Sequence, residues 1–68
     1  MLKQLLFVGI TCGSPPFVPH SKRHVSGHSY NDSVIYECIM GYKLVGNKSV
    51  TCQLAGHWTI PPTCEGIF

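Results

Sequence analysis

The chain has 68 residues, which is below the size at which an apolar core alone reliably outweighs the loss of chain entropy. With 44% apolar and 12% charged residues, its composition excludes a disordered tail and indicates one small globular domain. A formal net charge of +2 excludes the dense basic face of a nucleic-acid-binding protein.

Residues 1–11 carry one positive charge, Lys3, ahead of an apolar run from Leu5 to Ile10. The run is shorter than a complete signal peptide with its cleavage site, and far shorter than the ~20 residues of a transmembrane helix. We therefore expect residues 1–11 to be a partial signal, a linker or a fragment end, with no transmembrane segment in this chain. Residues 65–68 are expected to be a linker remnant after the folded segment 12–64.

The chain from Cys12 to Pro16 contains two prolines, which fix φ and remove two backbone donors. It should be extended and lie at an edge, since such a segment cannot be a central strand. Residues 19–29 are polar, contain Gly27 and show no periodicity. We expect them to form an exposed loop.

Three stretches alternate apolar and polar residues in the manner of half-buried strands: 34–38, 42–45 and 50–54. Because Gly46 and Asn47 separate the last two stretches, the pattern predicts a strand, a turn and a returning strand. No window keeps helical spacing, so the expected fold class is all-β with no helix between the first and last cysteines. Residues 56–64 hold the single tryptophan and are expected to cover the core.

The four cysteines are separated by 25, 13 and 11 residues, so no two of them share a tight turn. Structural zinc sites usually take two ligands from such a turn. Long spacings in a short chain favour two disulfides and an oxidising, extracellular compartment, although spacing alone leaves three connectivities open. The residues concerned are Cys12, Cys38, Cys52 and Cys64.

Two Asn-x-Ser sequons, at Asn31 and Asn47, are candidate glycosylation sites. Glycan acceptors of this kind are used on surface loops of secreted chains. The sequons therefore support a secreted or ectodomain location.

The ordered pattern of cysteines, glycines, aromatics and prolines resembles a sushi domain, also called a complement control protein module. The resemblance covers residues 12–64 and excludes the first eleven. The matching elements are Cys12-Gly13-x-Pro15-Pro16, Tyr30, Ser33-Val34-x-Tyr36-x-Cys38, Gly41-Tyr42-x-Leu44-x-Gly46, Cys52, Gly56-x-Trp58 and Pro62-x-Cys64.

The resemblance implies a small elongated β-module with Cys12 bonded to Cys52 and Cys38 bonded to Cys64. Where the family often has a glycine before the first alternating strand, this chain has Asn31. Asparagine is the next-best residue at positive φ, so we expect a left-handed backbone there. The expected core residues are Tyr36, Tyr42, Leu44 and Trp58.

The only basic and histidine-rich cluster lies within residues 19–29 and is the candidate partner-binding loop. It could contact an acidic protein surface or, weakly, an acidic glycan, while the competing interpretation is a solvated polar loop. Its residues are His20, Lys22, Arg23 and His24. Phe17, Val18, Ile39 and Met40 are expected to be exposed and available to a partner or a neighbouring domain.

No catalytic or metal site is expected. The carboxylates are few and scattered, and no motif places a nucleophile beside a base. His20, His24 and His28 recur every four residues, but Pro19 and Gly27 argue against the helix that would align them as ligands.

The sequence thus predicts an extracellular module that binds proteins or acts as a spacer, without cofactor, enzymatic activity or nucleic-acid partner. The resemblance places it beside neighbouring modules in a longer complement-regulatory, adhesion or receptor-type protein. Two alternatives stay open. The chain could be a nonfunctional truncated fragment of such a protein, or a cytosolic zinc protein using cysteine and histidine ligands.

Overall fold

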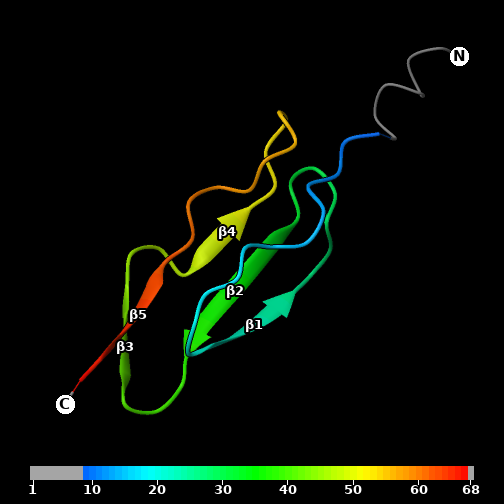
Figure 1. Ribbon diagram of the computed structural model, residues 1–68. Coiled ribbons are helices and arrows are strands. Elements are labelled where there is room, and N and C mark those ends of the chain that lie inside the picture. The colour runs from blue at the N-terminus through cyan, green and yellow to red at the C-terminus, as the bar shows by residue number, and fades with distance from the viewer. Residues whose placement is uncertain (1–8, 68) are drawn as a thin grey trace, which may run out of the picture.

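The computed structural model describes residues 9–67, and these form an all-β unit without helix (Figure 1). The expected segment 1–11 lies largely outside the described residues. The strands are β1 (Ser21–Val25), β2 (Ser33–Cys38), β3 (Tyr42–Val45), β4 (Ser49–Thr51) and β5 (Thr63–Gly66). Among residues 9–67 no helix is long and apolar enough to cross a membrane.

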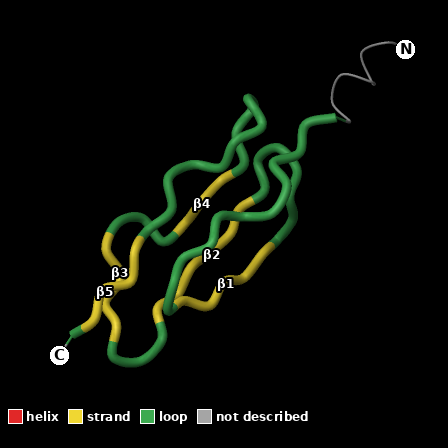
Figure 2. Tube along the Cα trace, in the orientation of Figure 1, coloured by secondary structure: helices red, strands yellow, loops and turns green. Residues whose placement is uncertain are grey.

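Two antiparallel sheets follow each other along an elongated body of 57 × 16 × 13 Å (Figure 2). Short turns connect β2 to β3 and β3 to β4, and a long loop connects β4 to β5. The larger sheet has the order β1-β2-β4, and the smaller one pairs β3 with β5. In the larger sheet Val34 lies opposite both Val25 of β1 and Val50 of β4. In the smaller sheet Leu44 lies opposite Cys64.

The core lies on the inner face of the larger sheet. Alternation along β2 turns Val34 and Tyr36 inward, with 0% and 1% of their surfaces exposed, while Ile35 and Glu37 face outward. Val50 of β4 joins them at 0% exposure. Val18 completes this buried cluster, and Leu44, Trp58 and Cys64 pack against it.

Both disulfides have the expected pairing. Cys12–Cys52 ties the N-terminal segment to the residue that follows β4, and Cys38–Cys64 joins the end of β2 to β5. The second bridge is therefore a covalent link between the two sheets. The fold class, the absence of helix between the first and last cysteines, and the two disulfides predicted by the resemblance are confirmed over the described residues.

Two strand predictions are wrong. The expected loop at residues 19–29 contains β1, because its backbone pairs with β2 even though its side chains show no apolar alternation. The returning strand at residues 50–54 is replaced by the short β4, which pairs with β2, while β3 pairs with β5. The strand β5 also continues to Gly66, so part of the segment 65–68 belongs to the sheet.

The prediction that Val18 is exposed is wrong, since only 4% of its surface is exposed. The segment that follows Pro15 and Pro16 is held against the sheet by hydrogen bonds that the apolar pattern does not reveal. The Ser21 hydroxyl donates to the Val18 carbonyl at 2.6 Å, which fastens the segment to the start of β1. Val18 thereby becomes part of the core.

Candidate functional site

The basic cluster is distributed over β1 and the residue before it, with different surroundings for each member. Lys22 and His24 project from the outer face of β1, where Lys22 lies opposite Glu37 of β2. His24 Nε2 is 3.6 Å from Glu37 Oε1, but both side chains are about two-thirds exposed, at 69% and 66%. A contact so exposed to water adds little stability. Lys22 and His24 are both exposed and accessible on the surface.

Arg23 points to the opposite face and has a structural contact. Its Nη1 donates to the carbonyl oxygens of Pro15 and Pro16 at 3.3 and 3.4 Å. The Tyr36 hydroxyl donates to the same Pro16 oxygen at 2.6 Å. These bonds hold the proline segment against the inner face of the sheet, so the Arg23 guanidinium is partly committed to the fold.

Burial raises the pKa of the Tyr36 phenol above its usual value, while the positive charge of Arg23 and its hydrogen bond act in the opposite direction. The phenol therefore stays neutral at physiological pH and serves as a donor to Pro16. Tyr36 has a structural role in the core.

His20 immediately precedes β1, and its ring has different surroundings from those of the β1 side chains. Its φ is 63°, and its ring stacks on Tyr42 with centroids 4.1 Å apart and planes at 13°. Its carbonyl accepts the Ile39 N–H at 3.0 Å. The structure thus places Lys22 and His24 together on one face, and separates Arg23 and His20 from them.

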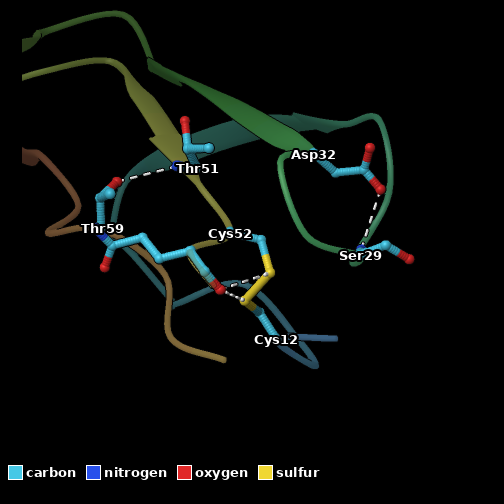
Figure 3. Close-up of a disulfide and its surroundings, with 7 residues drawn as sticks. Cys12, Ser29, Asp32, Thr51, Cys52 and Thr59 are labelled. Carbon is cyan, nitrogen blue, oxygen red and sulfur yellow. Dashed lines mark hydrogen bonds between the residues drawn. A yellow bond between two sulfur atoms is a disulfide. The ribbon is translucent and has the colours of Figure 1, made fainter. Parts of the chain in front are cut away.

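The Cys12–Cys52 disulfide lies near Asp32 of the first sequon, whose bond with Ser29 is drawn in Figure 3. Backbone hydrogen bonds connect the same sequon to Cys52. The Asn31 N–H donates to the Cys52 carbonyl and the Cys52 N–H to the Asp32 carbonyl, both at 2.9 Å. The Asp32 carboxylate accepts the Ser29 N–H at 3.1 Å. Asn31 has the expected positive φ, 75°, because it closes this turn.

Both sequon asparagines are exposed. Asn31 lies in the turn before β2, and Asn47 lies between β3 and β4, where its Oδ1 accepts the Ser49 N–H at 3.0 Å. Both positions are on the surface, as glycan attachment requires.

The four residues expected in the core differ in burial. Tyr36 is buried, whereas Tyr42, Leu44 and Trp58 are half-buried. Trp58 packs on the core with its ring edge-on to His28, at a centroid distance of 6.4 Å. Val34 and Val50, which complete the core, were not singled out individually, although the alternation in the sequence already placed them on the same faces as Tyr36 and Cys52.

Three of the four expected contact residues are exposed, at 80% for Phe17, 38% for Ile39 and 97% for Met40. Ile39 and Met40 occupy the turn between β2 and β3, near the C-terminal end of the molecule (Figure 1). They offer apolar surface at that end.

The residues that the structure describes contain no group of three histidine, cysteine or carboxylate side chains able to hold a metal ion. All four cysteines are consumed by the two disulfides.

A family model described as Sushi repeat (SCR repeat) matches residues 12–64. Complement control protein C3 of Vaccinia virus (strain Western Reserve) is 38% identical over 58 residues, covering 82% of this chain and 22% of that protein. The C4b-binding protein alpha chain of Rattus norvegicus is 39% identical over 65 residues, covering 84% and 12%. Complement factor H of Bos taurus is 40% identical over 58 residues, covering 82% and 5%. The chain thus spans less than a quarter of the length of each relative.

Proposed function

Since this chain belongs to the sushi repeat family, we propose that it is an extracellular, non-catalytic module that binds proteins or spaces binding modules in a longer protein. The observation that carries the proposal is that the residues of the family pattern build the fold, whereas other residues form the exposed surface. The cysteines, Tyr36 and Trp58, which carry the family resemblance, form the disulfides and the core. The exposed side chains of β1 and of the 39–40 turn are left for recognition.

The surroundings of the carboxylates support a non-catalytic role. Asp32 accepts a backbone N–H from Ser29 in a turn, and Glu37 faces His24 on the open surface. Neither arrangement provides the desolvated acid or base that catalysis at neutral pH requires.

We propose a complement protein as the partner, because the relatives include a complement control protein and a C4b-binding chain. The relatives are several times longer than this chain, which supports a parent protein with neighbouring modules. Contact with an acidic glycan through Lys22 is a weaker accessory interaction, since one exposed cation is strongly screened by salt.

A secreted or ectodomain location is proposed on the two disulfides and the exposed sequons. We propose that Asn31 and Asn47 carry glycans. Expression in a secretory host and treatment with peptide N-glycosidase should lower the mass by two glycans. Ser33→Ala and Ser49→Ala should each remove one glycan while leaving the asparagines in place, and an unchanged mass in either variant would contradict that site.

The binding experiment uses the oxidised, glycosylated module immobilised for surface plasmon resonance with purified C4b as the analyte. A binding module should give saturable binding to C4b that is lost on reduction of the disulfides. A spacer should give no binding alone, yet its deletion from the longer parent should weaken C4b binding by that parent. Failure of both measurements would contradict the proposed partner.

The truncated-fragment alternative is tested by the reading frame on both sides of the coding segment. Further cysteine quartets at a spacing of about 60 residues would indicate an array, whereas stop codons on both sides would leave a single module. The cytosolic zinc alternative requires free thiols, and both disulfides oppose it. Alkylation of the native protein before reduction distinguishes the two states, because only free thiols react.

A further inference from the structure

The backbone hydrogen bonds of β2 alternate between its two neighbouring strands. The Tyr36 N–H donates to the Lys48 carbonyl at 2.9 Å, so the backbone N–H and carbonyl groups of even-numbered β2 residues point toward β4. The Ser26 N–H donates to the Ser33 carbonyl at 3.2 Å, so the backbone N–H and carbonyl groups of odd-numbered β2 residues point toward β1. This alternation is the ordinary geometry of an antiparallel ladder.

The register then fixes which backbone groups of β1 are used. Lys22 lies opposite Glu37 and His24 opposite Ile35, so the backbone of these two β1 residues faces β2. By the same register, the backbone N–H and carbonyl groups of the other three β1 residues, Ser21, Arg23 and Val25, point away from β2. Outside the strand ladders, no backbone hydrogen bond within residues 9–67 involves Ser21, Arg23 or Val25.

The strand β1 is also an edge of the larger sheet. It lies at the margin of the molecule with β2 on its inner side (Figures 1 and 2). Four of its five residues, from Lys22 to Val25, are exposed. An exposed row of unpaired backbone groups is a template for an added strand.

Charge selects between possible occupants of this edge. In an antiparallel pair of two β1 strands centred on Arg23, the two arginines would face each other. Like charges opposite one another destabilise a strand pair, so a second copy is a poor occupant. A strand with a carboxylate opposite Lys22 has the complementary charge, and a second carboxylate opposite His24 is a hydrogen-bond acceptor for its ring.

We propose that the free edge of β1 binds an extended, acidic segment of a protein partner, which adds to the β1-β2-β4 sheet as a fourth strand. The backbone of Arg23 and Val25 provides the pairing, and Lys22 selects for carboxylates on the outer face. This inference rests on the proposed protein-binding function and names the partner chemistry. Neither an apolar strand nor a glycan satisfies both requirements.

The direct test uses the acetylated, amidated pentapeptide Thr-Glu-Val-Glu-Thr at millimolar concentration with the oxidised module. Amide hydrogen exchange followed by NMR should slow about tenfold at Arg23 and Val25, whose N–H groups face the edge. Lys22 and His24 should change little, because their N–H groups already face β2. Uniform protection, or protection absent at both Arg23 and Val25, would overturn the proposal.

Paired variants separate backbone pairing from charge. Val25→Pro removes an outward N–H while leaving the β1–β2 ladder intact, and Val25→Thr is its matched control. Lys22→Glu removes the selecting charge, and Lys43→Glu on β3 makes the same change in net charge away from β1. We expect at least about fivefold weaker peptide binding for Val25→Pro and Lys22→Glu, and wild-type binding for both controls. Each variant is first shown to keep the wild-type NMR fingerprint outside β1.

The remaining outcomes each overturn the inference in a different way. Equal binding of the peptide by Val25→Pro and Val25→Thr, together with binding of a heparin oligosaccharide, would indicate a charge site for glycans. Concentration-dependent dimerisation through β1 would indicate a second copy as the occupant. Wild-type binding of C4b by Val25→Pro and Lys22→Glu would retain the proposed function and reject β1 as its site. Absence of C4b binding by every form of the isolated module, together with unchanged C4b binding by a parent that lacks the module, would reject the proposed partner itself.

Discussion

Tyr36 shows how one side chain can connect three parts of so small a module. It lies on the central strand, is 1% exposed, and bonds through its hydroxyl to Pro16 in the N-terminal segment. Arg23 of the edge strand reaches the same carbonyl oxygen. The residue therefore fastens β1, β2 and the proline segment at one point.

Tyr36 should make stability depend on pH in the alkaline range. Because burial raises the pKa of its phenol, the folded state holds the proton more tightly than the unfolded state, whose pKa is about 10. Its contribution is full below pH ~10 and is lost as pH rises through the folded pKa. Urea unfolding at pH 8 and pH 11 should show a smaller alkaline loss for Tyr36→Phe than for the wild type.

The same substitution should cost about 1 kcal/mol at pH 8, because it removes the hydrogen bond to Pro16. Tyr30→Phe is the matched control, since the Tyr30 side chain is 49% exposed. An alkaline loss that is equal in the wild type and in Tyr36→Phe would assign the pH dependence to other groups.

Trp58 is the largest side chain packed on the core, although it remains half-buried. Trp58→Ala should destabilise the oxidised module by about 3 kcal/mol, since truncating a large aromatic leaves its neighbours unpacked. Trp58→Phe keeps much of the contact area and should cost less. Thermal unfolding of the three forms measures the order, and an unchanged melting temperature for Trp58→Ala would place the residue outside the cooperative core.

At the scale of elements, the turn before β2 depends on a backbone conformation rather than on side-chain packing. Asn31 has φ of 75°, and its N–H bonds to the carbonyl of Cys52. Asn31→Gly should leave stability nearly unchanged, whereas Asn31→Ala should cost about 1 kcal/mol, because a Cβ is disfavoured in left-handed backbone. Unglycosylated protein unfolded in urea isolates this effect, and equal stabilities would contradict it.

The strands that bury a clean alternation were predictable from the sequence, and the others were not. Val34 and Tyr36 of β2 gave the period-two pattern because the face that they share meets the core. The edge strand β1 has no such pattern, since its inward Arg23 bonds through its guanidinium to proline carbonyls. The four candidate site residues, three in β1 and His20 just before it, could be found from charge and placed in one segment. The sequence could not show that they have different surroundings.

The pairing of β3 with β5 could not be predicted from the sequence for a different reason. A glycine-containing turn after residues 42–45 favours a local hairpin, but the partner strand β5 lies about twenty residues further along the chain. The Cys38–Cys64 bridge brings β5 beside β3, and the pairing of the cysteines came from family resemblance rather than from their spacing. A long-range covalent constraint thus prevailed over a local turn preference.

At the scale of the whole molecule, one disulfide holds the N-terminal segment to the larger sheet, and the other joins the two sheets. Cys12 and Cys52 are 40 residues apart, and Cys38 and Cys64 are 26 apart. Loop closure of these lengths is worth about 4 and about 3.5 kcal/mol in the chain-entropy model, each comparable with the stability of a small domain. Only the second bridge joins the larger sheet to the smaller one.

Removal of that second bridge should therefore unfold the molecule unevenly. In a Cys38→Ala/Cys64→Ala variant, the two-stranded β3-β5 sheet loses its covalent tie to β2 and is too small to be stable alone. Hydrogen exchange at the Lys43 and Val45 amides should accelerate far more than exchange at the Tyr36 amide, which remains bonded within the larger sheet. The Cys12→Ala/Cys52→Ala variant is the control, because it leaves the link between the sheets intact. Equal acceleration at β3 and β2 would mean that the two sheets unfold as one unit, and that the bridge acts only by restricting the unfolded chain.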